Sequence, residues 1–333
     1  MLNPVTRLSA LQPSSLPHTS QPGFARTYQP GKLTLGLFFP IEAFDGLVPT
    51  MEQQAERARL AQAIGFAALW LRDIPLEDPT FGDLGQIYDP FVYLGYLAAQ
   101  TDTIALATGA IAIPVRHPLH LAKQAASVDQ LSRGRLLLGV ASGDRPVEFP
   151  AFGVDGDRRD EVFREHLEVL RRALREKHPA IRWSTGELAR ADVLPKPVAD
   201  RIPVLVTGSS RQPLDWIARH AEGWITYPRP LAQQAQVIQR WYEQVEAQCG
   251  ECFKPLTQSL YLDLADDPDE LPQPIHLGLR LGRHHLMRYL DHLRALGVNH
   301  VMFNLRFSRR PVPDVLDELA REILLAFPPH AAP

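Results

Sequence analysis

Two short turns of small and polar residues could together hold a phosphate group. Gly208-Ser209-Ser210 follows an apolar run, and a helix is expected to begin near Arg211 or Gln212. Small residues leave backbone N–H groups exposed, the hydroxyls add donors, and a helix N-terminus favours negative charge. Ser142-Gly143-Asp144 ends another apolar run, and Arg159, near the start of a helix, could grip phosphate oxygens with two N–H groups. The alternative for the first turn is an ordinary serine N-cap.

Both turns follow apolar runs that alternate with amphipathic helices, so the arrangement of these elements determines where the turns lie. Eight runs have the character of buried strands, at residues 33–40, 66–73, 103–114, 135–142, 203–208, 223–227, 259–265 and 298–307. Strands buried on both faces and separated by helices indicate a parallel sheet. Eight such units over about 300 residues predict a closed (β/α)8 TIM barrel, with a doubly wound open sheet as the alternative. In a barrel, the residues that follow the strands gather on one rim, where such barrels place their chemistry.

Composition divides the chain into two parts. Residues 1–32 are rich in Pro, Ser and Gln and lack periodicity. They therefore predict an irregular N-terminal arm that is mobile or lies over the surface. Residues 33–330 carry the repeating pattern without a break in composition, which predicts a single α/β barrel domain.

Charge and hydropathy argue against several classes of partner. The formal net charge is −3, the isoelectric point is near 6.5, and Lys and Arg are scattered among acidic residues. Such a surface gives no basic footprint for nucleic acid. No apolar run approaches the roughly 18 residues of a membrane helix, and the N-terminus lacks the pattern of a secretory signal. The expected location is the cytoplasm.

The chain has only two cysteines, Cys249 and Cys252, in the stretch QCGECF. A lone C-x-x-C could be redox-active or half of a zinc site, but no second C-x-x-C supplies the remaining ligands. The pair also follows a helical pattern instead of opening a helix after a strand. Free thiols in a reducing compartment and no metal site are therefore predicted.

An ordered series of stretches resembles the luciferase-like monooxygenase family, the bacterial luciferase type of flavin-dependent barrel. The matching stretches are AIGFAALWL, YDPFVYLGYLA, TGAIAIPVRHP, VDQLSRGRLLLGVASGD, FGVDGDRRDEVFREHLEVL, VLVTGSSRQ and AEGWI. The resemblance runs from about residue 33 to the last helix and is strongest over residues 64–170. It implies a reduced flavin in the barrel mouth, usually FMN and in some branches the deazaflavin F420.

The resemblance also implies roles for particular residues. The family's phosphate-contacting positions fall on Ser142, Asp144, Arg159, Ser209 and Ser210, although the Ser142 position can be arginine in luciferase. A non-proline cis peptide in the third strand, beneath the flavin ring, falls on Gly109-Ala110. Small residues suit a place where an aromatic ring must approach the backbone.

The acid–base residues depart from the family pattern. Luciferase carries a Glu-His-His run after its second strand, whereas this chain has Arg72 and Asp73 there, in WLRDIPLED. Arginine cannot exchange protons near neutral pH, and aspartate does so only with a raised pKa. Arg72 could instead stabilise an anionic flavin or bind an acidic substrate, or it could form a structural pair with Asp73. Arg306, at the end of the eighth strand, points to the same rim if alternation places it inward. His117 is expected to cap a helix N-terminus or to serve in packing, and not to act as an acid. The acidic segment 265–276 falls where family members often carry a mobile lid.

These observations predict a flavin-dependent oxidoreductase that uses reduced FMN and oxygen on an unknown small organic substrate. A separate flavin reductase would supply the reduced FMN. Two alternatives stay open: F420-dependent hydride transfer, and a non-catalytic flavin-binding protein, which the missing histidines favour. The resemblance further implies a homodimer formed through the helices at residues 89–100 and 118–131, whose faces carry small apolar residues.

Overall fold

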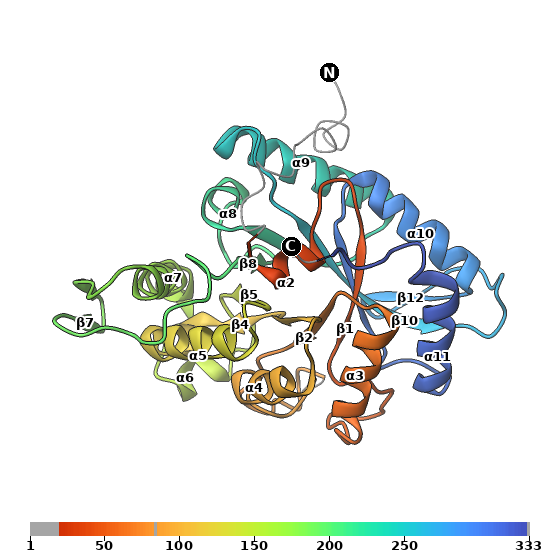
Figure 1. The fold of residues 1–333 in the computed structure, drawn as a ribbon, viewed down its shortest axis with the longest axis horizontal. Coiled ribbons are helices and arrows are strands. Elements are labelled where there is room, and N and C mark those ends of the chain that lie inside the picture. Colours follow the sequence, from red (N-terminus) through yellow and green to blue (C-terminus); the bar gives the residue numbers. More distant parts are fainter. Residues whose placement is uncertain (1–19, 83–84, 332–333) are drawn as a thin grey trace.

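The computed structural model describes residues 20–82 and 85–331, which form a closed parallel barrel (Figure 1). Its eight strands are β1 (Thr34–Phe38), β2 (Ala68–Leu71), β3 (Ala105–Thr108), β5 (Leu136–Ala141), β8 (Val204–Thr207), β9 (Gly223–Thr226), β10 (Leu256–Leu264) and β13 (His300–Asn304). Each strand pairs in parallel with the next, and β13 pairs with β1. The TIM barrel prediction is confirmed, and the closure excludes the open sheet.

Helices surround the strands in the predicted alternation. They are α3 (Gln54–Ile64), α4 (Pro90–Gln100), α5 (Pro118–Leu131), α7 (Arg159–Arg175), α8 (Leu214–His220), α9 (Leu231–Cys249), α10 (Arg283–Leu296) and α11 (Val312–Glu318). Local sequence fixes several of their ends. Asp89 accepts hydrogen bonds from two backbone amides at the start of α4, and His117 accepts one from the Leu119 amide at the start of α5. The capping role predicted for His117 is confirmed.

Two hairpins and several short elements interrupt the regular pattern. Strands β6 (Ile181–Trp183) and β7 (Gly186–Leu188) form a separate two-stranded sheet between α7 and β8. Strands β11 (Gln273–Ile275) and β12 (Gly278–Leu281) form a hairpin, and β12 adds to the edge of β10. The short strand β4 (Ile111–Ala112) resumes the third strand after a bulge, and the short helix α6 (Glu148–Ala151) lies between β5 and α7.

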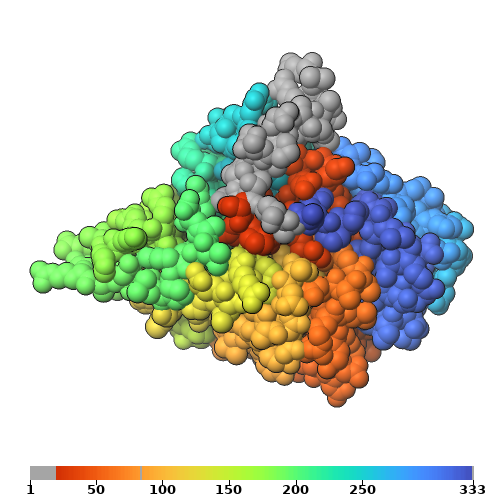
Figure 2. All heavy atoms as spheres, viewed as in Figure 1, coloured from red at the N-terminus to blue at the C-terminus, as the bar shows by residue number. Residues whose placement is uncertain are grey.

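The N-terminal segment packs against the barrel and is not irregular throughout. Helix α2 (Pro22–Thr27) places the rings of Phe24 and Tyr28 in a buried cluster with residues of the barrel interior, such as Trp70 and Met302. Tyr28 also shares a 2.8 Å hydrogen bond with Thr257 on β10. Figure 2 shows this red segment at the centre of the face, between early and late parts of the chain. The prediction of an irregular arm is therefore wrong for residues 20–32, because two aromatic rings gain buried contacts that composition does not reveal; residues 1–19 lie outside the described residues.

The two cysteines form a disulfide just beyond α9, so the prediction of free thiols is wrong. Gly250 takes a φ of 64°, and the turn brings the two Cα atoms to 5.8 Å. That separation lies within the usual range for disulfides. Neither cysteine is near the rim that carries the polar turns.

A buried histidine organises polar side chains inside the barrel. His300 Nε2 accepts a hydrogen bond from Trp70 Nε1, and His300 Nδ1 lies 2.7 Å from Thr34 Oγ1. The Thr34 hydroxyl donates to the Thr27 carbonyl, so Nδ1 must be the protonated nitrogen of a neutral ring. Burial lowers the pKa of His300 to about 3.

Acid should therefore weaken the fold through His300. The unfolded histidine takes up a proton near pH 6.5, whereas the folded one does so only near pH 3. Between these values, each pH unit of acidification should remove about 1.4 kcal/mol from the free energy of unfolding. We expect the unfolding free energy of His300→Gln to fall by about 1.4 kcal/mol less per pH unit than that of the wild type, as measured by urea unfolding at pH 6, 5 and 4. Parallel curves for the two proteins would contradict this assignment.

Candidate functional site

A cavity of about 710 Å³ opens at the carboxyl ends of the strands. It brings together all the residues predicted for the catalytic and cofactor-binding sites, although they come from five strand ends and the start of α7. These are Arg72, Asp73, Gly109, Ala110, Ser142, Gly143, Asp144, Arg159, Gly208, Ser209, Ser210 and Arg306. The barrel thus places them as predicted, while their roles stay predictions.

The turn after β8 differs in detail from the phosphate-binding turn that the sequence predicts. Helix α8 begins at Leu214 instead of at Arg211 or Gln212, so its N-terminus is not at the turn. Gly208, Ser210 and Arg211 all have positive φ angles, which curl the chain before the helix. The buried Ser210 hydroxyl donates to the Thr207 carbonyl at 2.8 Å and is used within the turn. Ser209 Oγ accepts from the Arg211 amide, which leaves its hydroxyl hydrogen for a ligand.

Arg159, at the start of α7, also lines the cavity. Its Nη1 donates to the Gly156 carbonyl at 2.7 Å, and its guanidinium lies 5.1 Å from the ring centre of Phe149. Its Nε is buried and has no hydrogen-bond partner among the described residues. Gly143 has a φ of 80°, and a Cβ there would lie 3.2 Å from the Phe149 ring. Buried donors without partners are costly, so this wall fits an anionic ligand.

The third strand breaks at the predicted bulge. The peptide bond between Gly109 and Ala110 is cis, as the family resemblance implies. A Cβ on Gly109 would lie 3.2 Å from the Phe38 ring and 3.3 Å from Trp70. No side chain fits there without displacing one of these rings. The bare backbone of the bulge therefore forms part of the cavity floor.

Asp73 is held in an ion pair that the sequence did not predict. Arg116 donates to both carboxylate oxygens of Asp73, at 2.6 and 2.8 Å, and the Ala112 amide donates to one of them at 3.2 Å. Burial lowers the pKa of Arg116, but its hydrogen bonds to Asp73 and Asp89 outweigh this and raise it. The predicted pair of Arg72 with Asp73 is wrong, because Arg116 from the turn before α5 takes both oxygens. Asp73 links the end of β2 to the bulge, and both of its carboxylate oxygens accept hydrogen bonds.

The two rim arginines contact loops as well as the cavity. The guanidinium of Arg72 lies against Gly85, where a Cβ would come within 2.5 Å of its Nη2. Arg306 donates to the carbonyls of Gly46 and Gly82 and lies between the rings of Phe44 and Phe307, 4.8 and 5.3 Å from their centres. Both arginines therefore line the cavity and also contact neighbouring loops.

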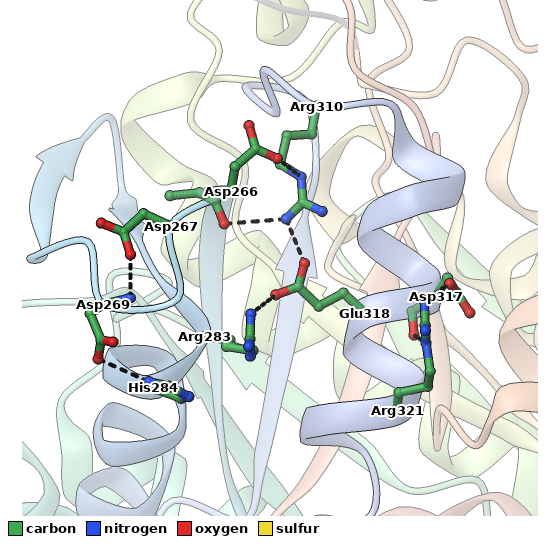
Figure 3. Close-up of polar contacts among 10 residues, drawn as sticks. Asp266, Asp267, Asp269, Arg283, His284, Arg310, Asp317, Glu318 and Arg321 are labelled. Carbon is green, nitrogen blue, oxygen red and sulfur yellow. Dashed lines mark hydrogen bonds and ion pairs between the residues drawn. The ribbon is translucent and has the colours of Figure 1, made fainter.

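The segment predicted as a lid is anchored at its base (Figure 3). Asp266 pairs with Arg310 at 2.8 Å, and Arg310 also pairs with Glu318 on α11 at 2.7 Å. Asp269 lies 2.9 Å from His284 Nδ1 on α10. At its other end, the segment continues into the β11–β12 hairpin, whose His276 and Leu277 line the cavity. Closure by this hairpin stays a prediction.

Sequence reasoning missed Glu148 and Arg145. Both are buried, line the cavity and lie on the segment that joins β5 to α7. Burial raises the pKa of Glu148 to about 7, although the nearby Arg145 opposes this rise. The sequence contains one indication that Glu148 belongs to the site. It lies between Val147 and Phe149, and a charged residue flanked by apolar ones can turn inward.

Comparisons with known proteins agree with this geometry. The sequence model for luciferase-like monooxygenases matches residues 33–271. The chain belongs to this family. An uncharacterised protein of Mycobacterium tuberculosis is 35% identical over 241 residues, 68% of this chain and 84% of that protein. An alkanal monooxygenase alpha chain of Photorhabdus luminescens is 26% identical over 198 residues, 59% of this chain and 50% of that one.

Solved structures share the barrel of this luciferase-like chain. The oxygenating constituent of 3,6-diketocamphane monooxygenase from Pseudomonas putida, solved with FMN, has a TM-score of 0.70 at 15% identity, covering 91% of this chain and 100% of that one. An F420-dependent secondary alcohol dehydrogenase with an F420-acetone adduct has a TM-score of 0.71 at 16% identity, covering 88% and 98%. These likenesses concern the fold. Family membership supports an oxidoreductase of the luciferase-like monooxygenase class. Within the described ranges, none of its helices has the length and apolar character for crossing a membrane.

Proposed function

We propose that this protein is an FMN-dependent monooxygenase that acts on a small organic molecule. The observation that carries the proposal is the cavity itself, which both Arg159 and Ser209 line and where the buried Nε of Arg159 lacks a partner among the described residues. A buried guanidinium nitrogen of this kind is stabilised by phosphate oxygens. The cavity volume is also within the range of cofactor sites.

The chain's own residues bind and orient the cofactor. Arg159, Ser209 and the backbone at Gly143 would hold the phosphate, and the bulge at Gly109 would lie against the ring. When bound, reduced FMN supplies electrons for the reaction with oxygen, while the protein supplies position and a dry environment. Phe38 lines the cavity beside the bulge, and Arg72 adds positive charge at the rim.

A separate flavin reductase is the proposed source of reduced FMN. We also propose a homodimer through α4 and α5. The exposed side chains of Val92 and Tyr96 on α4, at 74% and 50%, give that face the apolar surface that such a contact needs.

Anaerobic titration with reduced FMN, and separately with reduced F420, tests the proposal. We expect saturable FMN binding that Arg159→Ala weakens about tenfold or more, as for the loss of a charged hydrogen bond. Arg158→Ala is the matched control, because Arg158 lies one residue earlier, is exposed and pairs with Glu161. Preference for F420 would assign hydride transfer instead. If neither cofactor binds, the proposed function is wrong.

A further inference from the structure

Glu148 lines the cavity, but none of the proposed cofactor contacts involves it. It is the first residue of α6, and only 2% of it is exposed. Its carboxylate accepts a hydrogen bond from the Leu76 amide, on the loop after β2. Its Oε1 is buried and has no hydrogen-bond partner among the described residues. A buried carboxyl with a spare oxygen at a cavity wall requires a proton or a ligand on that oxygen.

The other acidic side chains of the cavity are in different situations. Asp73 gives both oxygens to Arg116 and the Ala112 amide. Asp144, at the carboxyl end of β5, is exposed to solvent. Among the described residues that line this cavity, Glu148 alone is a buried carboxyl group with an unused oxygen.

The groups around Glu148 keep its carboxyl group partly protonated near pH 7. Burial raises its pKa, Asp73 and Asp144 raise it further, and Arg145 opposes them. The guanidinium of Arg145 lies 4.3 Å from the ring centre of Phe81, so it also packs against the loop after β2. Two further arginines, Arg72 and Arg159, line the cavity from β2 and α7, and Arg116 is occupied by its two aspartates. A pKa of about 7 results, which suits proton exchange under cellular conditions.

We propose that Glu148 is the proton-exchanging residue of this cavity, which gives its Oε1 proton to the bound molecule and takes it back from solvent. In the forward step, the Oε1–H bond breaks, the proton moves to a basic atom of the ligand, and a carboxylate remains. The inference rests on the proposed function for the identity of the ligand. It also offers a substitute for the histidines that are absent after β2, on a segment that contacts the loop after that strand.

Glu148→Gln tests the inference in the protein without flavin. The infrared spectrum of the wild type should show a protonated carboxyl band that disappears as the pH rises through about 7. The band should be missing from Glu148→Gln and retained in Asp144→Asn, the matched exposed carboxyl. A wild-type spectrum without such a band, or a band that survives in Glu148→Gln, would overturn the proposal.

Stability gives a second readout with the opposite sign to that of His300. The folded state holds the Glu148 proton up to about pH 7, whereas the unfolded state releases it near pH 4.5. The stabilising contribution is therefore complete below pH 4.5 and is lost as the pH rises to about 7. The wild type should lose stability relative to Glu148→Gln between pH 5 and 7.5, and an unchanged difference would contradict the proposal. If Glu148→Gln does not fold, Glu148→Asp should retain the band at a shifted pH.

Flavin binding separates this inference from the proposed function. Ionised Glu148 opposes an anionic ligand, so wild-type affinity for reduced FMN should fall between pH 6 and 8 more than that of Glu148→Gln. If neither flavin binds but the carboxyl titrates as expected, only the proposed function fails. If FMN binds with the same pH dependence in both proteins and no band titrates, only the role of Glu148 fails.

Discussion

Asp73→Ala should lower the free energy of unfolding by about 3 to 5 kcal/mol, the cost of breaking a buried ion pair on one side. The Asp73 side chain is 1% exposed and that of Arg116 is 16% exposed, so little water replaces the lost bonds. Asp89, the other partner of Arg116, is partly exposed and cannot compensate fully. The Ala112 amide next to the bulge would also lose its acceptor. We therefore expect FMN affinity to fall together with stability.

Urea unfolding at pH 7 measures the first effect, and flavin titration of the folded variant measures the second. Asp144→Ala is the matched control, because this aspartate lines the same cavity but is exposed. Its unfolding free energy should change by about 0.5 kcal/mol or less. Equal losses in the two variants would show that the Arg116 pair does not stabilise the barrel.

Gly139→Ala should be at least as damaging, because β5 approaches β3 too closely for any side chain at this position. A Cβ on Gly139 would lie 1.9 Å from the Thr108 carbonyl oxygen and 3.1 Å from Ile225. The nearer atom belongs to the backbone, so a rotamer change cannot relieve the clash. Overpacking commonly costs about 1 to 3 kcal/mol, and a clash with a strand should exceed this range. Thr108 directly precedes the bulge, so flavin binding should be lost as well.

Gly95→Ala provides the matched control. Gly95 lies within α4, and a Cβ there would meet no atom within 4 Å. This variant should gain up to about 1 kcal/mol from helix propensity. Thermal unfolding of both proteins, followed by circular dichroism, should therefore give changes of opposite sign. A soluble Gly139→Ala protein with wild-type stability would mean that the strands are further apart than described.

The sequence by itself determined the barrel and the composition of its rim. Runs such as 135–142 are apolar on both faces, and their alternation with amphipathic helices allows few folds other than a closed parallel sheet. Polar turns at strand ends must then share one rim. For that reason, residues as distant in the chain as Arg72, Ser142 and Arg306 could be placed in one cavity.

Only the tertiary structure decided which polar groups at the rim already have hydrogen-bond partners and which have an atom without one. Asp73 and Glu148 are both buried acidic residues that line the cavity, yet Arg116 binds both oxygens of the first, while one oxygen of the second has no partner among the described residues. Likewise, the packing of Phe24 and Tyr28 against the barrel depends on contacts with strands that are far away in sequence. Periodicity reports which face of an element is buried. Pairing between side chains is set by distances across elements, and these exist only in the folded chain.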